Sequence, residues 1–259
     1  SFLFLMGILH FQQQGQGEDV ILIHGLFGSL ENLNMVSKGL AQQYRVTSVD
    51  VRNHGQSFHE DSMSYDELAS DVNETLASLN ITNYALLGHS MGGKIAMQMA
   101  LSKPSPVSKL IVADIAPIEY PQHHNQIIEG LQSIDLSVVK SRKDADAQLA
   151  NYVDESGVRQ FLLRNLAQEN GRFYFRCALD FIARNYPQIV VGYEGANTFN
   201  KPTLFIKGGN SDYITSAHRT KIMQHFPQSQ AKIIQGAGHW LHAEKTTAFN
   251  KIVSDFLQK

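Results

Sequence analysis

Ser90 stands between glycines in the stretch LLGHSMGGKIA, residues 86–96. Its neighbours fit the pattern Gly-x-Ser-x-Gly, in which the serine sits on a strained turn from a strand into a helix. The residues before it are apolar and strand-like, and the run MGGKIAMQMALS after it has helical spacing. Backbone N–H groups at a helix start favour developing negative charge. We therefore predict that Ser90 is a nucleophile. A glycine-flanked serine in an ordinary bend is the alternative.

A serine hydroxyl needs a general base beside it, normally a histidine oriented by a carboxylate. Of the eleven histidines, His239 directly follows a strand-like run near the C-terminus, in GAGHW, where the flanking glycines free the backbone to turn. We predict that His239 is the base. The other histidines with a helical or inserted context are expected at the surface (His218, His225 and His242) or without metal-ligand spacing (His123 and His124).

Two aspartates compete for the role of the acid. Asp114 closes the run KLIVAD, and Asp212 lies in the loop after TLFIKGG. Hydrolases with the chain order serine, acid, histidine commonly carry the acid three residues beyond the glycine that ends this later strand. Counting from Gly208, that position is Ser211, so Asp212 is out of register by one residue. The spacing favours Asp114, and Asp212 remains the alternative.

The run HGLFG, residues 24–28, follows the first strong strand and is similar to the His-Gly-x-x-Gly loop that supplies an oxyanion-binding N–H. We predict Leu26 as this donor, with Phe27 as the alternative, and Met91 as the second donor. Losing one such donor typically costs about 10²–10³ in turnover. His24 either shapes the loop by hydrogen bonding or is purely structural. Arg52, in the loop after the next strand, is expected to tie loops together.

The sheet that must position these residues is visible as short apolar runs, each followed by a stretch of helical period, the pattern of a parallel sheet with crossover helices. The predicted strands cover residues 20–25, 44–50, 84–90, 109–115, 203–209 and 231–239, and the predicted helices cover 32–43, 65–79, 91–102, 217–225 and 244–257.

The alternation of strands and helices is interrupted after the fourth predicted strand. Residues 116–201 contain no convincing strand, while 145–153 and 158–166 have helix-like spacing. We predict a core of residues 1–115 and 197–259 with a helical lid, 116–196, inserted over the strand ends. Ordinary packing helices are the alternative. Substrate contacts are expected from Phe27, Tyr120, Phe161, Leu162 and Trp240. The lid cations, such as Arg159, Arg164 and Arg176, favour a solvated helix face over contact with an anionic substrate group.

Composition excludes several functions. The chain has 259 residues, 43% of them hydrophobic, which suits one large core. A net charge of −2 provides no basic field for nucleic acid or an anionic membrane, so neither partner is expected. No dinucleotide, phosphate-loop or zinc-protease motif occurs, so no cofactor or metal is expected. We expect a monomer or homodimer that acts on a small molecule.

The single cysteine, Cys177, favours a reducing compartment. The apolar start SFLFLMGILHF lacks the basic region and cleavage site of a signal peptide. Because the chain opens on serine, we expect residues 1–5 to be foreign to the natural protein, with Met6 as its start and the cytoplasm as its location.

Six segments in chain order carry a resemblance to a known family: HGLFGS (24–29), DVRNHG (50–55), GHSMGGK (88–94), DIAP (114–117), GGNS (208–211) and GAGHWLHAEK (236–245). Together they resemble the bacterial YbfF esterases, a branch of the α/β-hydrolase superfamily with mitochondrial relatives. The resemblance implies the α/β-hydrolase fold with a mostly parallel central sheet, and a triad of Ser90, His239 and Asp114. It further implies hydrolysis of short to medium acyl esters, with acyl-CoA thioesters as a further class.

Two other functions stay open. The same site could serve carbon–carbon bond hydrolysis, perhydrolysis or a lyase-type elimination. A binding protein that kept the pocket without turnover is the alternative from another class.

Overall fold

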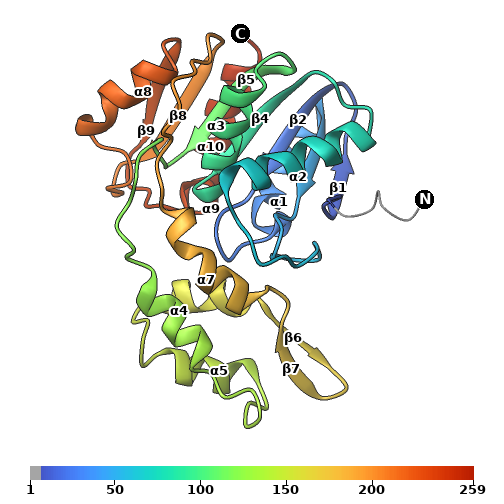
Figure 1. The fold of residues 1–259 in the computed structure, drawn as a ribbon, viewed down its shortest axis with the longest axis vertical. Helices are drawn as coiled ribbons and strands as arrows, with labels where there is room; N and C mark the ends of the chain where they lie inside the picture. Colours follow the sequence, from blue (N-terminus) through green and yellow to red (C-terminus); the bar gives the residue numbers. More distant parts are fainter. Residues whose placement is uncertain (1–6) are drawn as a thin grey trace.

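The computed structural model describes residues 7–259, and its core is a seven-stranded sheet with the strand order β1-β3-β2-β4-β5-β8-β9 (Figure 1). Only β1 runs antiparallel to its neighbour, β3, and every other pair is parallel. The strands are β1 (Phe11–Gln14), β2 (Glu18–Ile23), β3 (Tyr44–Val49), β4 (Tyr84–His89), β5 (Val107–Ala113), β8 (Thr203–Gly208) and β9 (Ser229–Ile234). The predicted α/β class with a mostly parallel sheet is confirmed. The prediction for residues 1–5 lies outside the described residues.

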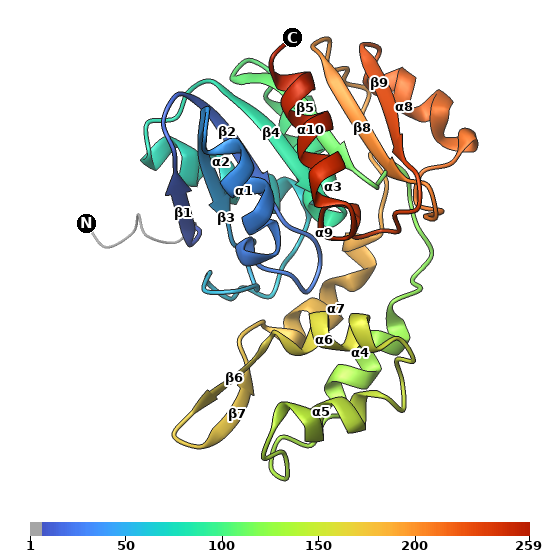
Figure 2. The ribbon, with the colours of Figure 1, turned by 180° about the vertical axis from the view of Figure 1, so that it is seen from behind.

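Both faces of the sheet are covered by helices, which explains its nearly continuous apolar strands. Successive residues of a strand point to opposite faces. Ile21 and Ile23 of β2 join the buried cluster that includes residues of α2 and α3, whereas Val20 and Leu22 join the cluster with α1 and α10. Figure 1 shows the face with α2 and α3, and Figure 2 the face with α1 and α10.

The core helices match the five predicted ones to within a few residues, except that the short helix α9 was not predicted. They are α1 (Asn34–Leu40), α2 (Tyr65–Ser78), α3 (Met91–Ser102), α8 (Arg219–His225), α9 (Leu241–Glu244) and α10 (Thr246–Leu257), with short 3-10 turns at Leu30–Leu33 and Ser216–His218. Helix α2 starts where Ser64 accepts a hydrogen bond from the Glu67 N–H and Glu67 bonds back to the Ser64 N–H. This reciprocal cap satisfies two N–H groups that a helix start leaves unpaired.

The insertion after β5 lies beyond the carboxyl ends of the strands, at the lower end of the molecule in Figures 1 and 2. It contains α4 (Asn125–Gln132), α5 (Arg142–Leu149), α6 (Ser156–Leu163), the hairpin strands β6 (Leu166–Glu169) and β7 (Arg172–Phe175), and α7 (Leu179–Ile189). All of these elements fall within the predicted limits, 116–196.

The prediction that residues 116–201 contain no strand is wrong. Strands β6 and β7 pair antiparallel around Asn170 and Gly171, whose φ angles are 51° and 77°. An Asn-Gly pair is a strong hairpin signal because both residues tolerate positive φ. Each strand is only four residues long, so an alternating period was not recognisable. Strand β1, FQQQ, was missed for the same reason.

A buried lysine joins the two connectors of the insertion to the core. The Lys94 ammonium, on α3, donates to the carbonyl oxygens of Ile118 (2.8 Å) and Val191 (2.6 Å). The connectors also bond to each other, since the Tyr120 N–H donates to the Val190 carbonyl at 2.8 Å. The entry and exit of the insertion are therefore both held by a residue of α3, the helix that begins directly after Ser90. Between Gly7 and Lys259, no helix combines the length and apolar character that crossing a membrane requires.

Candidate active site

Ser90 occupies a strained turn between β4 and α3. Its φ of 55° and ψ of −123° are rare for a residue with a side chain. The turn is tight enough that a Cβ atom on Gly88 would lie 2.1 Å from the Gly92 carbonyl oxygen, and a Cβ on Gly92 would lie 2.2 Å from that of Ile23. Only glycine fits at either position. Strain of this kind persists at functional sites because the surrounding structure imposes it.

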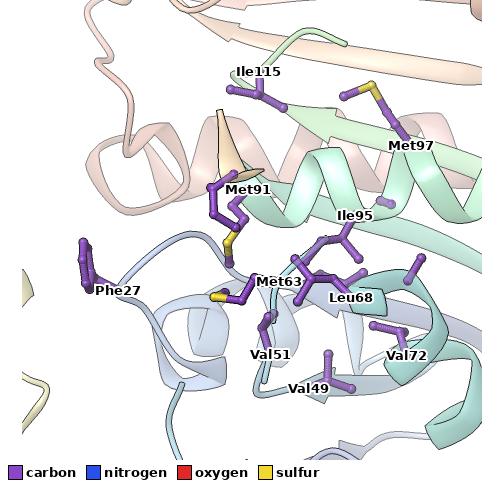
Figure 3. Close-up of a cluster of buried hydrophobic side chains, with 14 of the residues drawn as sticks. Phe27, Val49, Val51, Met63, Leu68, Val72, Met91, Ile95, Met97 and Ile115 are labelled. Atoms are coloured by element: carbon purple, nitrogen blue, oxygen red, sulfur yellow. The ribbon is translucent and has the colours of Figure 1, made fainter. Parts of the chain in front are cut away.

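The residue after the serine is anchored in the core. The Met91 side chain is buried in the same cluster as Met63 and Ile95, and Figure 3 shows it between the start of α3 and Met63. Its backbone N–H donates to no protein atom within residues 7–259. Met91 and Ser90 both line a small cavity of about 40 Å³. A fixed, unpaired N–H beside the serine is the feature that an oxyanion donor needs.

His239 lies between Ser90 and Asp114. Its Nε2 atom is 2.9 Å from the Ser90 Oγ atom, and its Nδ1 atom is 2.7 Å from Oδ2 of Asp114. With the Nδ1 proton donated to the carboxylate, Nε2 is left to accept the serine proton. The loop that carries His239 is fixed by the His89 ring, whose Nε2–H donates to the His239 carbonyl at 2.7 Å. Burial lowers the pKa of His89 well below its usual value, so this ring stays neutral.

Asp114 is fully buried at the end of β5, where three donors face its carboxylate. Oδ1 accepts the Gly208 N–H at 3.0 Å, and Oδ2 accepts the Ser211 hydroxyl at 2.5 Å in addition to His239. Hydrogen bonds to the charged form of a buried carboxylate offset the cost of burying it. The loop after β8 therefore supplies hydrogen bonds to the acid rather than the acid itself.

Asp212, the alternative acid, is exposed, and its carboxylate makes no hydrogen bond or ion pair in the described part of the chain. The neighbouring residue, Ser211, points inward to Asp114 instead. A shift of one residue in a tight turn redirects the side chain, which is why the out-of-register aspartate does not reach His239. The geometry brings Asp114, and not Asp212, to the histidine.

In the oxyanion loop, residues 24–28, the Leu26 N–H is available for an oxyanion. The Phe27 N–H is taken, because it donates to Nε2 of His54 at 3.0 Å. The alternative prediction, Phe27, is therefore wrong, because its N–H is bound by His54 in the loop after β3. The Leu26 N–H has no protein acceptor within residues 7–259, and Leu26 lines both cavities that reach Ser90.

Two buried histidines hold this loop in shape. His24 Nδ1 donates to the Gly25 carbonyl at 2.7 Å, and its Nε2 accepts the Val51 N–H at 3.0 Å. His54 Nδ1 donates to the Arg52 carbonyl at 2.9 Å while its Nε2 accepts from Phe27. Each ring needs one protonated and one bare nitrogen, hence the neutral form. Burial, with repulsion from His24 as the next cause, lowers the pKa of His54 to about 3. His24 thus shapes the loop by hydrogen bonding.

The catalytic pocket, a cavity of about 250 Å³, opens above Ser90 and His239 between the core and the insertion. Four of the five predicted substrate-contact residues line it: Phe27, Phe161, Leu162 and Trp240. The fifth, Tyr120, lines the smaller cavity, and its hydroxyl accepts the Ala116 N–H and donates to the Tyr213 carbonyl. The insertion also holds the oxyanion loop, because the buried Asn165 amide donates to the Phe27 carbonyl at 2.8 Å.

Tyr213 is a site residue that the sequence did not indicate. Its ring stacks on the His239 imidazole with centroids 3.9 Å apart and an interplanar angle of 19°. Its hydroxyl lies 2.7 Å from Nε2 of His123. His124 lines the catalytic pocket, and burial lowers its pKa to about 4. Only the position of Tyr213, two residues beyond Ser211, could have suggested that it lies near the acid.

Two histidines expected at the surface are buried, so that prediction is wrong. His242 packs edge-on against His89, and burial lowers its pKa to about 4. His225 is fully buried, with Nδ1 2.8 Å from the Asn197 carbonyl. Both lie on short helices with few apolar residues, so the sequence does not show which side of the helix faces the core. His218 is partly exposed. Arg52 is structural as predicted, since its guanidinium bonds to Asp71 through two hydrogen bonds of 2.7 and 2.9 Å.

Comparison with known proteins agrees with this architecture. The sequence family described as alpha/beta hydrolase fold matches residues 20–246. The E. coli (strain K12) protein named esterase YbfF is 36% identical and aligns over 95% of each chain. The mouse sn-1-specific diacylglycerol lipase ABHD11 is 39% identical over 92% of this chain and 80% of its own. A solved structure of a marine microorganism esterase has a TM-score of 0.94 and 40% identity, covering 96% of this chain and 99% of that one. The chain therefore belongs to the α/β-hydrolase family, as a hydrolase related to the YbfF esterases.

Proposed function

We propose that the protein is a serine esterase that hydrolyses carboxylic esters of short to medium acyl chains through a covalent acyl-enzyme. The observation that carries the proposal is the continuous chain of hydrogen bonds from Asp114 through His239 to the Ser90 hydroxyl. Relatives named esterase and diacylglycerol lipase support the ester class. Acyl-CoA thioesters are the further substrate class to test.

In the first half-reaction, His239 Nε2 takes the Ser90 proton as Oγ attacks the ester carbonyl carbon. The carbonyl oxygen becomes an oxyanion, which the N–H groups of Leu26 and Met91 bind. Asp114 stabilises the imidazolium that forms. When the tetrahedral intermediate collapses, the bond to the leaving alcohol breaks and His239 gives the alkoxide its proton. The acyl group is then bonded to Ser90 Oγ.

In the second half-reaction, His239 removes a proton from water, which attacks the acyl carbon. The second tetrahedral intermediate uses the same two N–H groups. Its collapse breaks the bond to Oγ, which takes back the proton from His239, and the carboxylic acid leaves. No step needs a metal or cofactor. The ester enters through the pocket that is lined by Phe161, Leu162 and Trp240.

The test is release of p-nitrophenol from p-nitrophenyl butyrate by the wild type and by Ser90→Ala. The account predicts turnover by the wild type and a loss on the order of 10⁴-fold or more in the variant. Residual turnover within about tenfold of the wild type would assign hydrolysis to another group. A cytoplasmic location and a monomeric or homodimeric state stay predictions, with the buried Cys177 fitting a reducing compartment.

A further inference from the structure

A second, larger cleft of about 610 Å³ adjoins the catalytic pocket. It lies between the oxyanion loop of the core and helices α5 and α6 of the insertion. The two cavities share a wall, because four residues line both of them: Phe27, Gly28, Asn32 and Phe161. A substrate bound at Ser90 can therefore extend over these residues into the cleft.

Cationic side chains converge on this cleft from three separate segments. Arg142 and Lys143 come from the start of α5, Arg164 from the end of α6, and Arg176 from the end of the hairpin. The Arg142 guanidinium donates to the Leu163 and Leu166 carbonyl oxygens. In residues 7–259, the side chains of the other three cations make no hydrogen bond or ion pair.

Few negative charges oppose these cations. The lining holds two carboxylates, Glu31 and Asp146. Asp146 is paired with Arg159 outside the cleft, at 2.8 Å. The cleft thus carries an excess of positive charge within a chain whose net charge is −2. A concave surface lined by one sign of charge concentrates its field and attracts the opposite ion.

The position of His239 decides which part of an ester faces the cleft. The leaving alcohol must lie close to Nε2 of His239, which protonates it. His239 lines the catalytic pocket, which adjoins the cleft, and it does not line the small cavity beside Met91. The acyl chain, on the other side of the carbonyl carbon, faces that cavity of about 40 Å³, which favours a short chain.

We propose that the cleft binds a phosphate group on the leaving alcohol, so that the preferred substrates are short-chain acyl esters of phosphorylated alcohols. Guanidinium forks match phosphate oxygens in geometry, and several cations suit a group with two negative charges. The inference rests on the proposed esterase function and specifies its substrate class.

The test compares 1-butyrylglycerol 3-phosphate with 1-butyrylglycerol, two esters that differ only in the phosphate. In Lys143→Gln/Arg164→Gln/Arg176→Gln, kcat/KM for the phosphate ester should fall about tenfold at low salt, and that for the neutral ester less than about twofold. The matched control, Lys38→Gln/Lys103→Gln/Lys232→Gln, removes the same charge from exposed sites outside the cleft. It should leave both values unchanged.

Equal kcat/KM for the two esters in the wild type would overturn the inference, as would equal losses on both in the cleft variant. Long-chain acylglycerol phosphate in vesicles is compared with the soluble butyryl ester to separate a lipid headgroup from a soluble phosphorylated alcohol. Selective use of the butyryl ester supports the proposal, and selective use of the long-chain ester overturns its short-chain specificity. If neither of these esters nor p-nitrophenyl butyrate is turned over, the proposed esterase function fails. Calorimetric binding of glycerol 3-phosphate to Ser90→Ala, with glycerol as control, then tests the phosphate site independently of turnover. If glycerol 3-phosphate does not bind, the inference is overturned.

Discussion

The Ser211 hydroxyl donates a hydrogen bond of 2.5 Å to Oδ2 of Asp114, the same oxygen that His239 contacts. Ser211 stands where many hydrolases of this chain order carry their acid. Here that loop contributes a neutral donor, and the carboxylate comes from the end of β5. The two residues together keep a buried charge at Nδ1 of His239.

The first prediction separates the two candidate acids. Asp114→Asn should lower kcat for p-nitrophenyl butyrate about 10³- to 10⁴-fold, because the amide cannot hold the productive tautomer of His239. Asp212→Asn should stay within about twofold, since that side chain is exposed and bonds to nothing in the site. Steady-state kinetics of both variants decide it. Comparable losses in the two would exclude Asp114 as the sole acid.

The second prediction concerns the donor to the acid. Ser211→Ala removes one hydrogen bond to a buried carboxylate, a bond worth about 1.5–3 kcal/mol. We expect kcat to fall roughly tenfold with KM little changed, because the oriented imidazole acts in the chemical step. The control is Ser105→Ala, which changes an exposed serine in the loop between α3 and β5. Full activity in Ser211→Ala would make this hydrogen bond dispensable.

A third prediction concerns the two connectors of the insertion. Lys94→Met strands the carbonyl oxygens of Ile118 and Val191, which the ammonium now satisfies. The free energy of unfolding should fall by about 2–4 kcal/mol in urea titrations. Lys251→Met, which removes only an exposed pair with Asp255, should change it by less than about 0.5 kcal/mol. A Lys94→Met protein as stable as the wild type would show that the connectors hold without the lysine.

The fourth prediction is loss of stability in acid. Burial lowers the pKa of His54 to about 3 and those of His124 and His242 to about 4. The unfolded chain protonates these residues near their ordinary value of 6.5, while the folded protein keeps them neutral. Stability is therefore complete above that pH and falls below it, by up to about 1.4 kcal/mol per pH unit for each histidine.

Urea unfolding of the inactive Ser90→Ala protein at about pH 7.5 and about pH 5.5 measures this effect without the chemistry. His242→Gln should flatten the pH dependence by roughly one proton, whereas His59→Gln, at an exposed ring, should not. Equal unfolding free energies at both pH values would mean that these histidines titrate normally.

The sequence was sufficient to predict six of the seven strands of the sheet, and three residues, Ser90, His239 and Asp114, that the structure brings together, for a physical reason. Doubly covered strands leave continuous apolar runs, and a tight elbow permits only small residues around Ser90. Both signals are local. Asp114 was recognisable because it directly follows such a run, and the carboxyl ends of parallel strands meet at one edge. The predicted strand 231–239 was too long: β9 ends at Ile234, and His239 lies five residues beyond it, in the loop between β9 and α9.

What the sequence did not show depends on contacts between distant segments. The choice between Leu26 and Phe27 is made by His54, in another loop. The inward faces of His242 and His225 depend on which side of a short helix packs against the core. Tyr213 stacks on His239 only because the β8 loop turns at Ser211. The hairpin at Asn170 is the exception, because its Asn-Gly turn is a local signal, but strands of four residues are too short to show a period.

The most direct test of the central claim is intact and peptide mass spectrometry of the protein mixed rapidly with p-nitrophenyl butyrate and quenched in acid. The account predicts one butyryl group on the peptide that contains Ser90, formed before steady state and absent from Ser90→Ala. Turnover of the ester with no acylated peptide, or a butyryl group on a different residue, would contradict a mechanism through Ser90.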